Sequence, residues 1–146
     1  MKRLLLLAAA LAFAAPVAAS PRTTLEFRLV VPCTGAAQPL ALKNSSEKLC
    51  VAPALIADLA NVTAAQAGFV NGFDAIRVTL DTAAAARMKA ATSGDGVRIG
   101  ILLDGRLVSA PAVYGPISKD VEVDFGEHGP GLQKIAAAIQ AGMGKK

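Results

Sequence analysis

The sequence predicts an α+β fold, in which a mainly antiparallel sheet is built from hairpins and two helices pack on one face. Two observations predict the sheet: the dipeptides Asn71-Gly72 and Asp104-Gly105 each stand between segments of alternating apolar and polar residues. Both dipeptides supply the positive φ angles that a two-residue type I′ hairpin turn requires. A third observation predicts the helices, because residues 82–92 and 132–141 lack this alternation, and the glycine-containing segment Ser93–Gly96 follows the first and Gly142 the second.

The first 20 residues have the three regions of a secretory signal peptide. A basic start at Lys2-Arg3 precedes an apolar run from Leu4 to Ala15, and small residues follow Pro16. Val17-Ala18-Ala19 fits an A-x-A-like site, so we expect cleavage after Ala19. The alternative is an uncleaved membrane anchor, but the run is short for the ~30 Å of hydrocarbon that it would have to span.

Cleavage after Ala19 would leave a chain of 127 residues, which suits one domain. We expect residues 20–142 to form that domain and residues 143–146 to be a flexible tail. This chain holds no apolar run long enough to insert stably into a membrane. Because the signal peptide directs export, we expect a periplasmic or secreted protein. Its formal net charge is +2, and its arginines are scattered rather than clustered, which argues against nucleic acid binding.

The two cysteines, Cys33 and Cys50, are 17 positions apart. In an exported protein such a pair most often forms one disulfide. Closing a loop of this length contributes about 3 kcal/mol in the chain-entropy model. A thiol-redox role usually needs a reactive pair such as C-x-x-C, and a metal site needs further ligands. We therefore expect a structural disulfide.

Local patterns predict the first strands. Residues 24–31 alternate apolar and charged side chains, and residues 49–52 are expected to return as a short partner strand tied to them by the disulfide. Residues 54–60 are ambiguous between a helical turn and extended chain. Residues 64–70 and 73–80 flank Asn71-Gly72 and predict the first hairpin.

A helix follows, with Asp81 or Thr82 as its N-cap and its end near Thr92. Met88 is its only sizeable apolar side chain among many alanines. Two alternatives stay open: the helix lies close to the sheet, because its small residues allow near contact, or it is exposed.

The second hairpin covers residues 97–110, with Asp104-Gly105 as its turn. This register places Leu103 opposite Arg106 and Ile101 opposite Val108. Residues 121–125 predict another strand. The last helix is expected over residues 132–141, with Gly142 as its C-terminal stop.

Patterns that carry catalytic or metal chemistry are not found in the sequence. His128 is the single histidine, and no nucleophile-elbow sequence such as G-x-S-x-G is present. Glu127 and Asp124 near His128 form a common surface pattern rather than a ligand set. Asp120, Glu122 and Asp124 would share one strand face, which we expect to be solvated. The sequence thus predicts no catalytic residue, no metal and no cofactor.

The hairpin segment LDGRLVSAP, residues 103–111, resembles the LDG-x-(V/I)-x-S-A-P signature in the head of the first periplasmic domain of SecD. SecD is a membrane subunit of the bacterial protein-export machinery. Three further segments are similar to the family in the same order: LCVAPALIADLANVTAAQAGF, FDAIRVTLDTAAAARMKAAT and GLQKIAAAIQAG. The resemblance covers about Lys48 to Gly142.

The resemblance implies the fold of the SecD head and a non-catalytic binding module that contacts extended polypeptide during or after export. An exposed strand edge or a groove beside the hairpin would serve this role. The alternative is a structural or interaction domain of the cell envelope with an unrelated partner. The family pattern does not ordinarily include the cysteine pair. Its Gly-rich segment after the hairpin is replaced here by YGPISKDVEVD, so a family-type cleft at that segment is not carried over.

Overall fold

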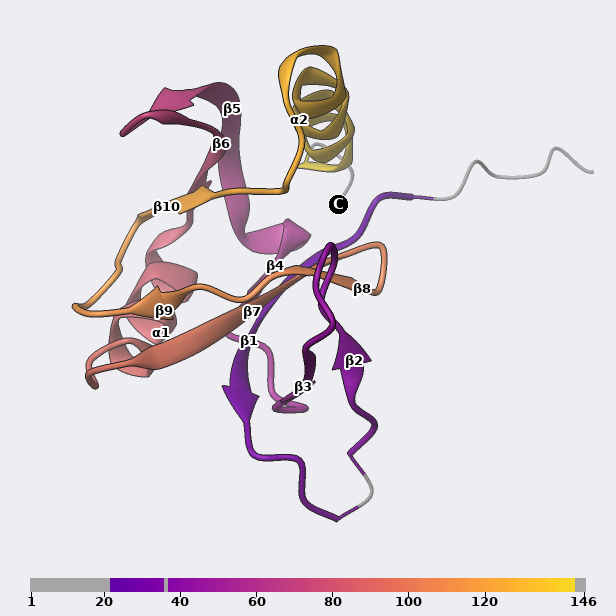
Figure 1. The fold of residues 1–146 in the computed structure, drawn as a ribbon. Helices are drawn as coiled ribbons and strands as arrows, with labels where there is room; N and C mark the ends of the chain where they lie inside the picture. The colour runs from indigo at the N-terminus through magenta and orange to yellow at the C-terminus, as the bar shows by residue number, and fades with distance from the viewer. Residues whose placement is uncertain (1–21, 36, 144–146) are drawn as a thin grey trace, which may run out of the picture.

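The computed structural model describes residues 22–35 and 37–143. The expected signal peptide, residues 1–19, lies outside the described residues, as do residues 144–146 of the expected tail. Figure 1 shows two groups of strands, with one helix standing beside β5 and β6 and the other near β7 and β9.

The larger sheet has the order β2-β3-β1-β7-β8 in the described chain. Its strands are β1 (Leu25–Val31), β2 (Leu40–Ala41), β3 (Lys48–Val51), β7 (Val97–Leu103) and β8 (Arg106–Ser109). Two short strands join it off this path: β4 (Ala57–Asp58) pairs with β1, and β9 (Ala112–Val113) pairs with β7. All these pairs are antiparallel, as the sequence predicts.

The smaller sheet has the order β10-β6-β5, also with antiparallel pairing. Its strands are β5 (Val62–Val70), β6 (Phe73–Leu80) and β10 (Asp120–Val123). The β5–β6 hairpin turns at Asn71 and Gly72, whose φ angles are 50° and 92°. The dipeptide therefore adopts the conformation that its sequence indicates.

The first helix, α1 (Thr82–Ala91), is buried along one side rather than exposed. The side chain of Asp81 caps it by accepting a 2.8 Å hydrogen bond from the Ala84 backbone N–H. Ala84 and Met88 are both completely buried. Of the two alternatives for this helix, the structure shows the one in which small residues allow close packing.

The second helix, α2 (Gly129–Met143), packs against β5 and β6. Leu132, Ala136 and Ile139 are its buried residues and recur at helical spacing. Of the ambiguous residues 54–60, Ala57 and Asp58 form β4, and Leu59 and Ala60 belong to a 3₁₀ helix, η1 (Leu59–Asn61). A single apolar core includes residues from both sheets and both helices. The α+β class predicted from the sequence is confirmed, with the strands divided between two sheets.

The β7–β8 hairpin differs from the expected register beyond its turn. Asp104 and Gly105 have φ angles of 51° and 78°, and Leu103 lies opposite Arg106. Ile101, however, lies opposite Ser109 rather than Val108, because a β-bulge adds one residue to β8. The added residue shifts the alternation, so that Leu107 and Ala110 are both buried.

Gly142 does not end the last helix as expected. α2 continues to Met143, which packs half-buried against the core. A Cβ atom at position 142 would collide with the side chain of Leu59 in η1. The glycine therefore leaves room for the end of the Leu59 side chain, a tertiary contact that a local stop signal does not include.

Candidate functional site

A disulfide joins Cys33 and Cys50, with 5.1 Å between their Cα atoms. Cys50 lies in β3 opposite Val31 of β1, and it is completely buried. The disulfide therefore fastens β3 to the strand that pairs with it. Because β2 pairs only through β3 in the strand order, its position depends on this link as well.

The two ends of the larger sheet, β2 and β8, approach each other. The backbone N–H of Lys43, just after β2, donates a 3.0 Å hydrogen bond to the carbonyl oxygen of Leu107 in β8. Figure 1 shows β2 and β8 side by side, although they stand at opposite ends of the strand order. The sheet thus curls until its two edges nearly meet.

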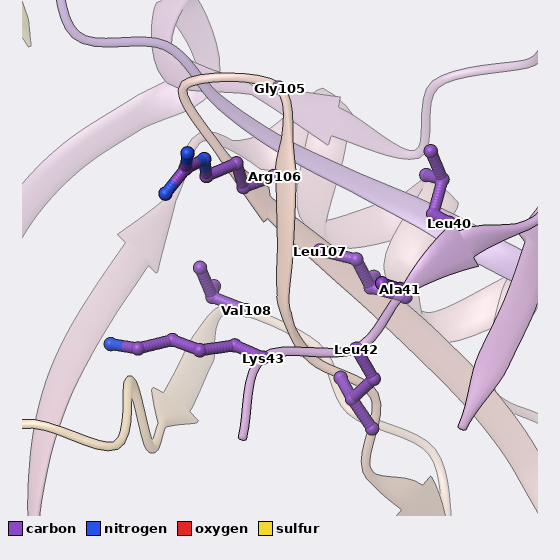
Figure 2. Close-up of a pocket in the computed structure, with 8 residues that line it drawn as sticks. All are labelled: Leu40, Ala41, Leu42, Lys43, Gly105, Arg106, Leu107 and Val108. Atoms are coloured by element: carbon purple, nitrogen blue, oxygen red, sulfur yellow. The ribbon is translucent and has the colours of Figure 1, made fainter. Parts of the chain in front are cut away.

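A groove of about 420 Å³ lies where these two edges do not close. Figure 2 shows the residues that line it, which are Leu40, Ala41, Leu42, Lys43, Gly105, Arg106, Leu107 and Val108. We call it the β2–β8 groove. Leu107 is buried, and the side chains of Leu40, Leu42 and Val108 are half-buried, so the walls are largely apolar.

The strand pairing directs backbone groups into the β2–β8 groove. Arg106 pairs with Leu103 next to a two-residue turn, so its own N–H and C=O face β7. The N–H of Leu107 faces the groove, and its carbonyl oxygen is the one that accepts the hydrogen bond from Lys43. The N–H of Leu42 donates to the Glu47 carbonyl at 3.0 Å, so the backbone of Ala41 points away from β3. Both walls therefore present main-chain groups to an incoming strand.

Lys43 lines the groove and is held in place by two hydrogen bonds. Its Nζ donates hydrogen bonds to the Phe125 carbonyl at 3.0 Å and to Glu127 Oε1 at 2.7 Å. The hydrogen bond from Lys43, reinforced by its positive charge, lowers the pKa of Glu127 below its usual value. Lys43 thus connects the edge of the sheet to the loop before α2, and its charge is compensated there.

The side chain of Arg106 extends from β8 on the same side as those of Val108 and Lys43, whereas Leu107 extends towards β2 (Figure 2). Arg106 is exposed, and its guanidinium group has no hydrogen-bond or ion-pair partner among the described residues. It therefore supplies an uncompensated positive charge beside an apolar groove.

The acidic strand face has partners on the neighbouring strand. Glu122 accepts a 2.8 Å hydrogen bond from Arg77, and this bond raises the pKa of the guanidinium group. Asp120 accepts a 2.8 Å hydrogen bond from the hydroxyl of Thr79. Both acidic side chains belong to exposed residues, as the sequence predicts.

The residues around His128 point to different partners. His128 Nδ1 lies 2.9 Å from Asp74 Oδ2, whereas Glu127 binds Lys43. Asp124 accepts a 2.7 Å hydrogen bond from the backbone N–H of Gly126. Across residues 22–35 and 37–143, no three histidine, cysteine or acidic side chains gather closely enough to hold a metal ion.

Two further apolar features lie outside the β2–β8 groove. A pocket of about 320 Å³ reaches Met88, Ile99 and Ile101 from the loop after the β7–β8 hairpin, beside the exposed side chain of Tyr114. At the tip of the β5–β6 hairpin, 74% of the surface of Phe69 is exposed. The pocket lies at the segment where the sequence departs from the SecD pattern.

Sequence reasoning did not identify β2, although it forms one wall of the groove. Residues 35–48, between the two cysteines, are rich in turn-forming residues and do not stand out as a strand in the sequence. The one local signal is the alternation of Leu40 and Leu42 with Ala41 and Lys43 after a proline.

Within the described chain, neither helix has the length and apolar character to cross a membrane.

Comparison with known families matches residues 37–143 to the SecDF P1 head subdomain. The chain is also similar to a structure described as a membrane component SecDF that enhances protein export, with 21% identity and a TM-score of 0.65 over 84% of this chain and 64% of that one. A structure of SecDF in a super-membrane-facing form matches 84% of this chain and 19% of that one, with 21% identity and a TM-score of 0.63. The chain thus spans less than two thirds of both, and the likeness shows a shared fold. No curated protein sequence matches the chain.

Proposed function

The chain belongs to the SecDF P1 head subdomain family, and we propose that it is an exported, non-catalytic domain that binds extended polypeptide in the β2–β8 groove. The observation that carries this proposal is the groove between two strand edges that almost meet. An extended segment can add to such an edge through main-chain hydrogen bonds, and its alternate side chains can enter apolar pockets.

The groove has the features that this mode of binding needs. The backbone of Ala41 and the backbone N–H of Leu107 face it from opposite walls. Leu40, Leu42 and Val108 provide apolar contact for side chains that point to one face of an added strand. Main-chain recognition tolerates many sequences, as a domain that contacts many exported chains requires.

A role in protein export is proposed from the family. The first of the two similar structures is described as enhancing protein export. The partners proposed here are polypeptides or envelope proteins outside the cytoplasm. The Cys33–Cys50 disulfide suits this location, because disulfides persist in oxidising compartments.

Export itself is proposed from the segment of residues 1–19. The mature protein should begin at Ser20 and be recovered from the periplasm or the medium. Intact-mass measurement of the protein after expression with its full sequence decides this point. A retained Met1 together with recovery in the membrane pellet would contradict the proposal.

The binding proposal is tested by filling the groove. Ala41 is exposed on its wall, so Ala41→Trp should obstruct it, whereas Ala86→Trp makes the same change on the exposed side of α1. The probe is a fluorescein-labelled peptide of about twelve residues that alternates valine and threonine, followed by anisotropy. We expect Ala41→Trp to weaken binding at least tenfold and Ala86→Trp to leave it unchanged. If both variants bind the peptide with equal affinity, the groove is not the binding site.

The second candidate is an interaction domain with an unrelated envelope partner. The exposed Phe69 and Phe73, beside the Asn71-Gly72 turn, favour it, because large exposed apolar side chains often mark a protein interface. A photoreactive side chain at position 73 and, separately, at position 41 distinguishes the two candidates in cells. Cross-links to nascent secretory chains from position 41 support the first, and one defined partner from position 73 supports the second.

A further inference from the structure

We propose that the β2–β8 groove prefers polypeptide segments in which an acidic residue adjoins an apolar stretch, and that Arg106 determines this preference. The inference rests on the proposed function, because it names the class of segment that the same groove binds. It depends on the charges around the groove rather than on its volume.

The lining residues carry two positive charges and no carboxylate. The charge of Lys43 is compensated by Glu127, at 2.7 Å. The guanidinium group of Arg106 has no such partner in the part of the chain that the structure describes. The groove therefore presents one uncompensated positive charge to whatever enters it.

The carboxylate nearest to Arg106 in the sequence, that of Asp104, is hydrogen-bonded to another group. Asp104 precedes Arg106 by two residues, and its Oδ1 accepts a 2.8 Å hydrogen bond from the backbone N–H of Thr24. That bond ties the turn to the start of β1. Asp104 thus stabilises the hairpin end, and Arg106 stays available to a ligand.

The geometry places this charge where an added strand would meet it. Arg106 and Val108 extend on the same side of β8 (Figure 2). An extended segment that enters the groove alongside β8, where the Leu107 carbonyl oxygen is already bonded to Lys43, would set one of its side chains beside Arg106 and an apolar one beside Val108. Cross-strand pairs of opposite charge are favourable, and like charges are unfavourable. The planar guanidinium group can also bind a carboxylate through two parallel N–H···O hydrogen bonds.

The test uses three peptides with one shared apolar sequence and a single flanking residue that is Glu, Gln or Lys. Anisotropy titrations with the wild-type chain should give affinities in the order Glu, Gln, Lys, with roughly three- to tenfold between the extremes. The difference should shrink in high salt, because Arg106 is exposed.

Substitutions at position 106 test whether the Arg106 side chain causes the preference. Arg106→Gln should remove the order of affinities, and Arg106→Glu should invert it. The control is Lys89→Glu, which makes the same change of charge on the exposed side of α1. An inversion by Lys89→Glu would show that overall charge causes the preference and would overturn the role of Arg106.

The outcomes separate this inference from the proposed function. Equal binding of the three peptides by the wild-type chain, with loss of all three in Ala41→Trp, overturns the charge preference and leaves polypeptide binding in place. Failure of the wild-type chain to bind any of the three overturns both. The peptide series needs no variant, so its result does not depend on how well the Arg106 variants fold.

Discussion

Lys43 and Glu127 form an ion pair with 2.7 Å between Nζ and Oε1, although 84 residues separate them in the sequence. The same lysine donates its backbone N–H to Leu107 of β8. It thereby connects three parts of the chain: the end of β2, the outer edge of β8 and the loop before α2. Its backbone hydrogen bond marks a point where the two sheet edges meet beside the groove.

This ion pair predicts a dependence of stability on pH. Because Lys43 lowers the pKa of Glu127 in the folded state, the pair stabilises the fold at pH values above the ordinary pKa of a glutamate. That contribution is lost as the pH falls through the lowered pKa. The melting temperatures of the wild type and Glu127→Gln should therefore differ most near neutral pH and converge as the pH falls below the lowered pKa of Glu127.

The control for this measurement is Asp95→Asn, which removes one carboxylate from an exposed loop residue without an ion-pair partner in the described chain. If the melting temperatures of Glu127→Gln and Asp95→Asn differ from that of the wild type by the same amount at every pH, the Lys43–Glu127 pair does not contribute to stability.

The turn at Gly105 predicts a second result. A Cβ atom there would meet no neighbour within 4 Å, but its φ of +78° is strained for any side chain, β-branched ones above all. Gly105→Val should destabilise the fold by about 1–3 kcal/mol in urea denaturation. Gly115 has equally open surroundings without a positive φ, so Gly115→Val is the matched control and should change stability by less than about 0.5 kcal/mol.

The Cys33–Cys50 disulfide predicts a third result, a loss of stability when the cross-link is removed. Replacing both cysteines by alanine should lower the free energy of unfolding by about 2–4 kcal/mol, because the cross-link restricts the unfolded chain. A reducing agent should shift the urea midpoint of the wild type in the same direction and leave that of the double variant unchanged. A wild-type midpoint that is insensitive to full reduction would mean that the disulfide does not stabilise the fold.

The apolar core predicts a fourth result, a large loss of stability when a buried side chain is shortened. Ile101 is 1% exposed and packs in the common core, so Ile101→Ala should cost about 2–5 kcal/mol. Leu55 loses the same kind of group on truncation, but 41% of its surface is exposed. Leu55→Ala should therefore be markedly milder in the same urea experiment. Equal effects would contradict the inward position of Ile101.

The features that the sequence predicts correctly depend on a few adjacent residues. Asn71-Gly72 and Asp104-Gly105 adopt positive φ angles because their conformational preferences are local. The N-cap at Asp81 is local in the same sense, since its carboxylate needs only the backbone N–H of Ala84. Hairpins and helix starts of this kind can be predicted from a single sequence.

The groove could not be predicted in this way. It arises where Leu40–Lys43 meet β8, and these segments are far apart in the chain. The bulge in β8 and the close approach of Gly142 to Leu59 have the same origin, because each depends on which elements pack together. A two-residue strand such as β2 has too few positions for its alternation to stand out from a connecting loop.

Hydrogen exchange measured by NMR tests most directly whether polypeptide adds to the sheet edges at the β2–β8 groove. The measurement compares individual backbone amides with and without a saturating extended peptide. We predict slower exchange at Ala41 and Leu107, whose main-chain groups face the groove, and unchanged exchange at Phe69 and Phe73. Protection confined to the β5–β6 hairpin tip, or none at Ala41 and Leu107, would contradict the account.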